Sequence, residues 1–377
     1  MTVHGFFLYL CRPNGSFIGD SDLVIMDGDS KITINDVASA AGVSKGTVDR
    51  VIHNRGEVSG KSREKVLEVI EKLGYKPNLY ASVLASRKLK KIVCVIPEFQ
   101  EGDFWSLTYK GIESGKEKST SFGVSVLTEK YDQYDVESFR KACDRTLSIS
   151  PSGVVIAPMF RTETGKFVAE LKDRGISYIY IDSRLEDDGC LAYFGMPMYQ
   201  SGYLCADLLT GGENVGNVYA VRIARDKEGL SDPMAARRAG FMDYISEKCP
   251  DCRVTEVLID PRDKEGIESR LGSLFSGDAE ERKYIVTFNS RIYLVADYLR
   301  EHKIGACRVV GFDVLDKNLS ALRDGFVQIL IAQHSDLQAE YAITAMADWL
   351  LIGKRVARKD NYTQMDILNR LNCDYYL

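Results

Sequence analysis

The sequence predicts a small all-α helix-turn-helix headpiece followed by an α/β body of two doubly wound parallel-sheet subdomains with a cleft between them. Three helix-length segments with capping residues fill positions 33–73. From residue 91 onward, short apolar strands alternate with amphipathic stretches of helical length, which is typical of a parallel α/β architecture. About 285 residues are too many for one simple doubly wound sheet, so two subdomains are expected.

Capping residues mark the ends of the three helices predicted in the headpiece. Ser and Thr accept hydrogen bonds from free N–H groups in a first helical turn, and glycine adopts the left-handed conformation that ends a helix. Apolar residues at i, i+3, i+4 and i+7 from Val66 to Leu73 support the third helix. The expected helices are Thr33 through Ala41 with Gly42 as the stop, Ser44 to about His53, and Ser59 or Ser62 to Leu73 with Gly74 as the stop.

Nine apolar segments after residue 91 are predicted to be strands of the body. They are Ile92–Ile96, Val124–Leu127, Gly153–Ala157, Tyr178–Ile181, Val218–Val221, Val254–Ile259, Tyr284–Phe288, Arg308–Phe312 and Val327–Ile331. The expected division of the chain is an N-terminal extension at 1–30, the headpiece at 31–77, a hinge or linker at 78–90, subdomain 1 at about 91–194 plus 318–332, and subdomain 2 at about 195–317 plus 333–377. The extension is expected to be disordered, or to precede a true start at Met26.

The charge of the chain is distributed unevenly. The formal net charge is −5, which by itself does not suggest a nucleic-acid partner. Residues 31–90, however, hold twelve Lys/Arg against six Asp/Glu, a local balance of +6, so the rest of the chain carries −11. A basic head on an acidic body indicates that only the head meets phosphate.

The nine cysteines have no framework spacing, and most of them lie in apolar runs. Buried, reduced thiols in a cytosolic protein are expected from this pattern. Cys249 and Cys252 have the spacing of a redox or metal pair, but a zinc site needs a second ligand pair that the sequence does not offer. No metal and no cofactor are therefore expected.

The second predicted helix carries side chains that suit contact with DNA. Lys45 and Arg50 can reach guanine O6 and N7 or a phosphate, Thr47 can bond a phosphate, and Gly46 lets the backbone approach closely. A helix-turn-helix places such a helix in the major groove while the first helix braces it. The inward residues are expected to be Ala38, Ala41, Val43, Val48 and Val51, and the outward ones Lys45, Gly46, Thr47, Asp49 and Arg50.

The segment ITINDVASAAGVSKGTVDRVIHNRGEVSGKSREKVLEVIEKLGYKPN resembles the headpiece of the lactose repressor (LacI/GalR) family without a break. The resemblance implies that Lys45 and Gly46 hold the two main base-contacting positions, with Arg50 as a third contact. It also implies phosphate contacts from several small polar residues and one arginine. The expected DNA-binding set is Thr33, Ser44, Lys45, Gly46, Thr47, Asp49, Arg50, Asn54, Ser59, Arg63, Asn78 and Leu84.

Two further features of this region bear on DNA recognition. Asp49 stands where the family usually has Ser; its carboxylate repels phosphate but can accept from cytosine N4 or orient Arg50. The segment from Asn78 to Ser86 resembles the family's hinge helix, in which a leucine wedges into the minor groove at the centre of the operator. Leu84 takes that position here, and such wedging kinks the duplex.

Polar and aromatic residues follow successive strands of the body, where open α/β sheets bind ligands. The rings of Phe104 and Trp105, after the first strand, can stack on the C–H face of a sugar. Asp182 and Arg184, after the fourth, can serve vicinal hydroxyls as acceptor and donor. The expected effector-binding set is Asp103, Phe104, Trp105, Asp182, Arg184, Arg237, Asn289, Phe312, Asp313 and Gln333.

The body resembles the ribose-type periplasmic sugar-binding fold, joined to the headpiece as in the lactose repressor family. The resemblance places Arg237 where that fold has a sugar-binding arginine at a helix start, with Arg238 as the alternative. Ala157 stands where the ribose-type pattern has Asn, which indicates a ligand other than ribose or a different hydroxyl pattern.

These observations predict a sequence-specific transcription regulator, by family default a repressor, acting in the cytoplasm. It is expected to bind near-palindromic double-stranded DNA as a homodimer, under control of a monosaccharide or a derivative. A sugar-binding solute protein without a transcriptional role is the alternative, to which the body alone would fit. An enzyme is not expected, because no phosphate-binding or hydrolase motif is found and the four histidines lie far apart.

Overall fold

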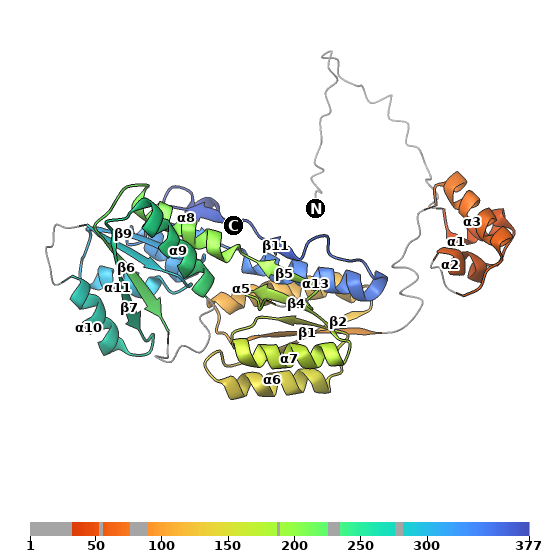
Figure 1. The fold of residues 1–377 in the computed structure, drawn as a ribbon, viewed down its shortest axis with the longest axis horizontal. Coiled ribbons are helices and arrows are strands. Elements are labelled where there is room, and N and C mark those ends of the chain that lie inside the picture. The colour runs from red at the N-terminus through yellow and green to blue at the C-terminus, as the bar shows by residue number, and fades with distance from the viewer. Residues whose placement is uncertain are drawn as a thin grey trace, which may run out of the picture. The chain divides into compact units, whose positions relative to one another are not determined.

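The computed structural model describes residues 32–52, 56–75, 89–186, 189–224, 234–275 and 282–376 (Figure 1). The chain separates into two compact units, residues 1–78 and residues 79–377. The first unit contains the predicted headpiece and the second contains the body. Among the described residues, no helix combines the length and apolar character needed to cross a bilayer.

The headpiece consists of the three predicted helices, α1 (Ile34–Ala41), α2 (Lys45–Ile52) and α3 (Gly60–Leu73). Thr33 and Asp36 form a reciprocal capping box: the Asp36 carboxylate accepts from the Thr33 N–H at 2.7 Å, and the Asp36 N–H donates to the Thr33 hydroxyl at 3.4 Å. The left-handed conformation of Gly42 and Gly74 ends α1 and α3, as predicted. The buried core residues are Val37, Ala38, Ala41, Val48, Val51 and Val66.

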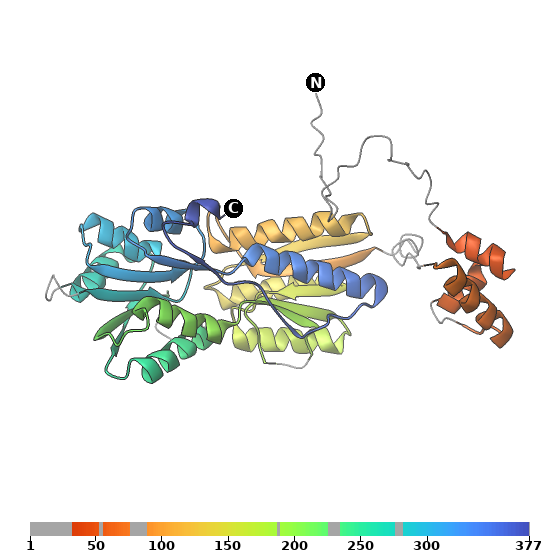
Figure 2. The same cartoon turned by 90° about the horizontal axis from the view of Figure 1, so that it is seen from above.

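The first sheet of the body has the order β11-β5-β4-β3-β1-β2, and all of its strands are parallel. One face carries α5 and α13 and the other carries α6 and α7, which buries both faces of the sheet (Figures 1 and 2). The elements are β1 (Lys90–Pro97), α5 (Phe104–Thr120), β2 (Val124–Tyr131), α6 (Val136–Ser148), β3 (Gly153–Ile156), α7 (Arg161–Asp173), β4 (Ser177–Asp182), β5 (Ala192–Gly195), α13 (Ser335–Ile352) and β11 (Asp360–Tyr362).

The second sheet has the order β12-β10-β9-β8-β6-β7, and β12 is its antiparallel edge strand. Helices α8 and α9 cover one face, while α10, α11 and α12 cover the other. The elements are α8 (Met198–Thr210), β6 (Asn217–Ile223), α9 (Ala235–Lys248), β7 (Arg253–Ile259), α10 (Lys264–Leu274), β8 (Lys283–Thr287), α11 (Tyr293–Glu301), β9 (Cys307–Phe312), α12 (Asp316–Arg323), β10 (Ile329–Ala332), β12 (Asp366–Leu368) and a 3₁₀ turn, η1 (Cys373–Tyr375).

The expected assignment of residues 318–332 to subdomain 1 is wrong. β10 pairs with β9, with Ile331 opposite Phe312, so this segment belongs to the second sheet. α13 and β11, which follow it, return to the first sheet, so most of 333–362 was also misplaced. Three short strands, β5, β11 and β12, were not predicted. β11 and β12 have three residues each, which is too few for an alternating pattern to be detected.

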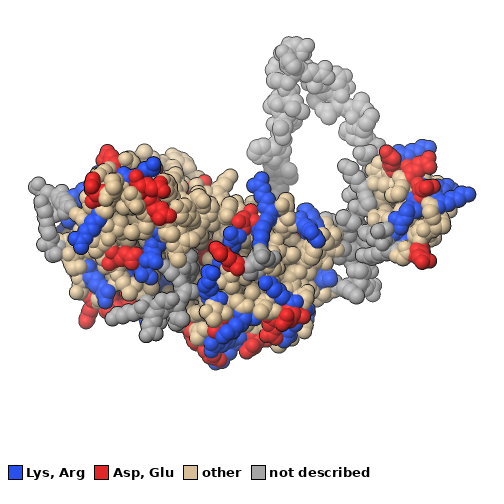
Figure 3. All heavy atoms as spheres, in the orientation of Figure 1, with Lys and Arg blue, Asp and Glu red and all other residues tan. Residues whose placement is uncertain are grey.

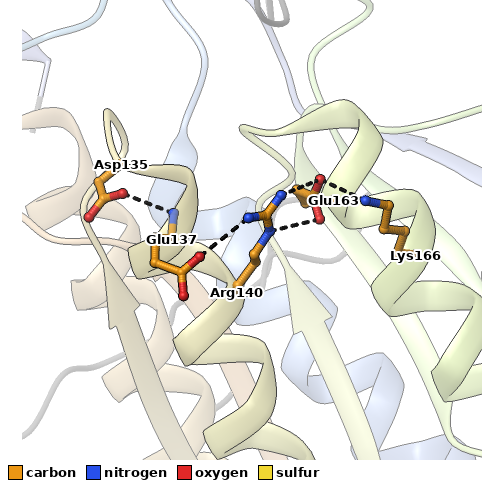
Figure 4. A network of polar contacts seen from close by, with 5 residues as sticks. All are labelled: Asp135, Glu137, Arg140, Glu163 and Lys166. Atoms are coloured by element: carbon orange, nitrogen blue, oxygen red, sulfur yellow. Dashed lines mark hydrogen bonds and ion pairs between the residues drawn. The ribbon is translucent and has the colours of Figure 1, made fainter.

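An exposed ion-pair network ties α6 to α7 (Figure 4). The Arg140 guanidinium donates to both carboxylate oxygens of Glu163 at 3.1–3.2 Å, and Lys166 donates to the same carboxylate at 3.0 Å. These two cations lower the pKa of Glu163 to about 2. Because the network faces solvent, it contributes little to the free energy of folding. Its role is to align the two helices.

The Cys249–Cys252 pair has the properties of packed thiols. Both are free, and Cys249 donates to the Glu213 carbonyl at 3.2 Å. Burial raises the pKa of Cys252 to about 11, which keeps the thiol protonated at neutral pH and therefore unreactive. Among the described residues, no group of His, Cys, Asp and Glu side chains is arranged to hold a metal ion.

Candidate functional site

Helix α2 presents one polar face to solvent. Lys45, Gly46 and Arg50 are exposed, whereas Val48 and Val51 are buried against the other two helices. Acidic and basic side chains both lie on the headpiece surface (Figure 3). Apart from Arg55, residues 32–75 contain six basic and six acidic residues. The basic surplus predicted for residues 31–90 therefore comes from residues outside the three helices.

Small polar residues at the helix starts are used as caps. The Ser44 hydroxyl accepts from the Thr47 N–H at 3.1 Å and lies 2.9 Å from the Thr47 hydroxyl. Ser59 caps α3 by accepting from the Ser62 N–H at 3.3 Å. These residues set the start of each helix, where free N–H groups favour a phosphate. The predicted contact residues Asn54, Asn78 and Leu84 lie outside the described residues.

Gly46 is not required by the packing of the headpiece. A Cβ atom at this position would lie 3.8 Å from Ser44 Oγ and 3.9 Å from Arg50 Nη2, which is ordinary van der Waals contact. Its backbone is not left-handed either. Glycine in a helix costs about 1 kcal/mol relative to alanine, so packing and conformation give no reason for it here. The absence of a side chain at Gly46 would allow a binding partner to approach the backbone of α2 closely.

In the body, four predicted residues from different elements meet in a buried polar cluster. Asp182 ends β4 of the first sheet, Asp313 follows β9, Gln333 follows β10, and Arg237 lies in the first turn of α9. Their exposed fractions are 5%, 4%, 4% and 1%. Gln333 Nε2 donates to Asp313 Oδ1 at 2.7 Å, and Arg237 Nη2 lies 3.5 Å from Gln333 Oε1. The cluster thus joins strand ends of both subdomains, as the strand-end rule predicts.

Burial dominates the electrostatics of the cluster. It raises the pKa of Asp182 to about 7 and that of Asp313 to about 6, because a carboxylate loses hydration there. Arg237 opposes both shifts, and Asp313 adds to the shift of Asp182. Among the described residues, no donor hydrogen bonds to the Asp182 carboxylate. A largely buried carboxylate without a protein donor favours a partner that donates hydrogen bonds.

The two aspartates are held in unusual backbone conformations. Asp182 has φ 63° and Asp313 has φ 72°, in the left-handed region that few non-glycine residues adopt. Asn318 supports the second turn, because its Nδ2 donates to the carbonyls of Phe312 at 3.1 Å and Asp313 at 3.0 Å. Tyr193 supports the first by donating to the Asp182 carbonyl at 2.7 Å. Such conformations at strand ends are typical of functional sites.

Arg237 is surrounded by neutral acceptors and an aromatic face. Its Nε donates to Ser201 Oγ at 3.0 Å, its Nη1 donates to the Phe288 carbonyl at 2.6 Å, and its guanidinium lies 3.8 Å from the centre of the Phe312 ring. Three methionine sulfurs lie 3.3–3.4 Å from its terminal nitrogens. They belong to Met196, Met198 and Met234. These methionines are not predictable from the sequence, because an apolar residue carries no signal of a polar site.

Gln333 also touches the segments by which the chain crosses between the two sheets. Its carbonyl accepts from Gln338 Nε2 at 2.8 Å and from the Thr363 hydroxyl at 2.8 Å. Gln338 lies in α13, and Thr363 lies between β11 and β12. Gln333 therefore contacts Asp313 and Arg237 through its side chain and two crossing segments through its backbone.

Other predicted effector residues lie elsewhere. Trp105 is buried in the apolar core of the first subdomain, with Phe104 edge-on at 4.9 Å and only partly buried, so Trp105 is packed as core. Asp103 is exposed at the start of α5, where its carboxylate accepts from the Gln100 N–H at 3.0 Å. This packing does not favour the predicted stacking of Trp105 on a sugar. For Phe104 the stacking role stays a prediction.

Three further polar residues are engaged in contacts outside the cluster. Arg184 pairs with Asp360 at the start of β11, and Asn289 donates to the Ile223 carbonyl at 3.0 Å. Arg238, the alternative to Arg237, pairs with Glu256 at 2.9 Å on the surface. Arg237 is thus the arginine of this helix that enters the cluster.

A close contact between α8 and α9 positions Arg237. A Cβ atom at Gly202 would lie 1.7 Å from the Arg237 carbonyl oxygen, and one at Gly240 would lie 2.0 Å from the Tyr199 carbonyl oxygen. The two backbones therefore touch where glycine occurs, which brings Ser201 within hydrogen-bond distance of Arg237. Any larger residue at Gly202 must push the helices apart.

We expect Gly202→Ala to lower the free energy of unfolding by about 1–3 kcal/mol or more, the usual cost of overpacking, and to weaken effector binding by displacing Arg237. Urea denaturation followed by tryptophan fluorescence measures the first effect. Gly165→Ala in α7 is the control, because a Cβ atom there meets nothing within 4 Å and alanine favours a helix. Equal stability of Gly202→Ala and the wild type contradicts the positioning role of this contact.

Comparison with known proteins agrees with both units. Residues 33–78 match the bacterial regulatory proteins of the lacI family, and residues 92–355 match the periplasmic binding protein domain. A solved structure described as a putative LacI transcriptional regulator from Bacteroides fragilis is 31% identical, with a TM-score of 0.72. The match covers 77% of this chain and all of that one.

Curated relatives match over shorter stretches. Catabolite control protein A of Streptococcus mutans is 39% identical over 110 residues, which cover 29% of this chain and 32% of that protein. The ribose operon repressor of Lactococcus lactis is 41% identical over 81 residues, 22% of this chain and 24% of that protein. The matched stretches thus span about a third or less of these relatives.

A helix-turn-helix headpiece joined to a two-subdomain body of the periplasmic-binding-protein type defines a class of bacterial regulatory proteins. The chain belongs to the lacI family of bacterial regulatory proteins. The predicted family and fold class are confirmed.

Proposed function

We propose that this protein is a cytoplasmic repressor that binds a near-palindromic operator as a homodimer and is controlled by a small sugar-like effector. The observation that carries the proposal is the buried cluster at the strand ends of both subdomains, in a chain that also carries an exposed DNA-binding helix. The relatives named after catabolite control and the ribose operon support a role in carbohydrate metabolism.

For the DNA-binding surface, the proposal assigns base contacts to the exposed face of α2. Lys45 and Arg50 are exposed cations of that helix, and Gly46 between them allows the backbone to approach a base pair closely. The caps Ser44 and Ser59, together with Thr33, Thr47, Asp49 and Arg63, are proposed to complete the contacts. Asn54, Asn78 and Leu84 keep the roles that the family resemblance implies.

Control by the effector is proposed to depend on the fact that the cluster residues come from both subdomains. Asp182 belongs to the first subdomain, while Arg237, Asp313 and Gln333 belong to the second. A ligand that donates hydrogen bonds to both aspartates stabilises the arrangement in which the subdomains approach. Because such a ligand binds two arrangements of the body unequally, it shifts the population between them and thereby DNA affinity.

A test is fluorescence anisotropy of the full-length protein with labelled genomic fragments upstream of carbohydrate genes, repeated with a panel of monosaccharides. We expect sequence-selective binding that weakens as salt increases and changes with one of the sugars. Protein that binds a sugar but shows no selective DNA binding in any ligand state would instead support a solute-binding protein. Dimer formation is measured separately by analytical ultracentrifugation.

A further inference from the structure

The buried cluster holds more negative than positive charge. Asp182 and Asp313 supply two carboxylates and Arg237 supplies one guanidinium, all with exposed fractions of 5% or less. Solvent screens such charges poorly, so an imbalance of one charge acts strongly on anything that binds beside them. With both aspartates ionised, the formal charge of the cluster is −1.

We propose that the effector of this protein carries no negative charge: the site accepts an uncharged polyhydroxyl sugar or an amino sugar and rejects sugar phosphates and sugar acids. This inference rests on the proposed function and deepens it by naming the charge class of the ligand. It follows from the number and placement of the charged groups around the cluster.

The guanidinium of Arg237 is already committed to protein groups. Ser201 accepts from its Nε and the Phe288 carbonyl accepts from its Nη1, and the Phe312 ring covers one face. The three methionine sulfurs occupy the space around its terminal nitrogens. A phosphate or carboxylate binds arginine through two parallel N–H groups, which here requires displacing these neighbours.

Two nearby arginines do not neutralise the net negative charge of the cluster, because each is paired with another acidic residue. Arg184 is paired with Asp360, and Arg238 is paired with Glu256. Among the described residues, Arg237 is the one cation that acts on the pKa of both aspartates, and Gln333, which hydrogen bonds to Asp313, is neutral. Within the described part of the chain, a ligand anion placed beside Asp182 would thus meet a carboxylate whose charge is offset by Arg237 alone.

The Asp182 carboxylate favours a ligand that donates hydrogen bonds. It is buried and, within the described part of the chain, has no hydrogen-bond donor, and the hydroxyl of the adjacent Ser183 is also buried without a partner. Hydroxyl or ammonium groups of a ligand satisfy such a carboxylate, whereas an ionised carboxylate or phosphate group of a ligand accepts hydrogen bonds and has none to donate to it. Burial raises the pKa of both aspartates, Arg237 opposes both shifts, and the nearby Asp313 adds to the shift of Asp182.

Isothermal titration calorimetry of the full-length protein at pH 7.5 tests the proposal with matched series. One series is D-glucose, D-glucosamine, D-glucuronate and D-glucose 6-phosphate, a second is the corresponding galactose set, and a third pairs D-ribose with D-ribose 5-phosphate. In any series that binds, we expect each anionic member to bind at least about tenfold more weakly than the neutral sugar, corresponding to about 1.4 kcal/mol.

Two variants make the test specific to the cluster. Asp182→Asn and Asp313→Asn each bring its formal charge to zero, so the ratio between neutral and anionic affinities should fall in both. Asp251→Asn is the control, because this exposed residue changes the net charge of the protein equally and contacts Asn214 on the surface. The control should keep the wild-type ratio.

The possible outcomes separate the inference from the proposed function. An anionic sugar that binds as well as its neutral parent, or binds alone, overturns the inference and leaves a sugar-controlled regulator standing. A wild-type ratio in both asparagine variants also overturns it. If no carbohydrate binds although selective DNA binding is present, the sugar-effector proposal and the inference fail together.

Discussion

Replacing Arg237 with methionine is expected to abolish the effector response and to lower the free energy of unfolding by about 3–5 kcal/mol, the range for a buried charge left without its partner. Asp182 and Asp313 would remain buried without the cation that, among the described residues, lowers the pKa of both. Methionine preserves much of the side-chain volume, so a cavity contributes little to the loss. Chemical denaturation and calorimetric titration measure the two effects.

The control for this variant is Arg238→Met. Arg238 is the next residue of the same helix and pairs with Glu256 on the surface, so its loss should cost at most about 1 kcal/mol. Arg237→Met with wild-type stability and effector affinity would show that the arginine does not balance the aspartates.

The sign of the pH dependence follows from the raised pKa values. Asp182 and Asp313 take up protons more readily in the folded protein than in the unfolded chain, so their ionisation destabilises the fold as pH rises through about 6 to 7. In Arg237→Met this penalty grows, because the arginine no longer favours the ionised forms. The deficit of the variant relative to wild type should therefore be larger at pH 8 than at pH 5.

The second large effect is expected at the DNA-binding helix. Lys45→Ala should weaken binding to the specific operator by about 1–3 kcal/mol, or roughly five- to 150-fold, if this lysine contacts a base edge. Binding to unrelated DNA should fall much less, because one phosphate-type contact is a small part of nonspecific affinity. Anisotropy titrations with operator and scrambled duplexes at one salt concentration measure both.

Lys72→Ala is the matched control, because Lys72 is an exposed lysine at the C-terminal end of α3. It removes the same charge from the headpiece. Equal losses of specific affinity in the two variants would assign the role of Lys45 to general electrostatics, and the proposal of a base contact would then be abandoned.

Local signals account for what the sequence predicted well. The Thr33 cap, the Gly42 stop and the buried Val48 depend on neighbours within a few residues, so their pattern predicts the headpiece directly. Asp182 and Asp313 follow strands whose order and direction are constrained, which explains why the strand-end rule found the cluster.

Contacts between distant residues account for what the sequence did not predict. Arg184 follows a strand end, which is the position expected of an effector-binding residue. Its ion-pair partner Asp360, however, lies 176 residues away on β11, a strand too short to detect from the sequence. Trp105 looks like a ligand platform until α13 is placed on the first sheet, where the two share an apolar core. The error in assigning 318–332 has the same origin, because only the pairing of β10 with β9 decides it.

Gln333 has a consequence for how a protein of this kind acquires a new ligand. Its amide contacts the cluster, while its carbonyl fastens α13 and the β11–β12 connection. Under the proposed function, specificity and signal transmission therefore meet in one residue. A substitution selected for a new effector at this position alters the responsiveness of the regulator at the same time, whereas changes at Met198 or Met234 can tune the ligand while leaving those connections in place.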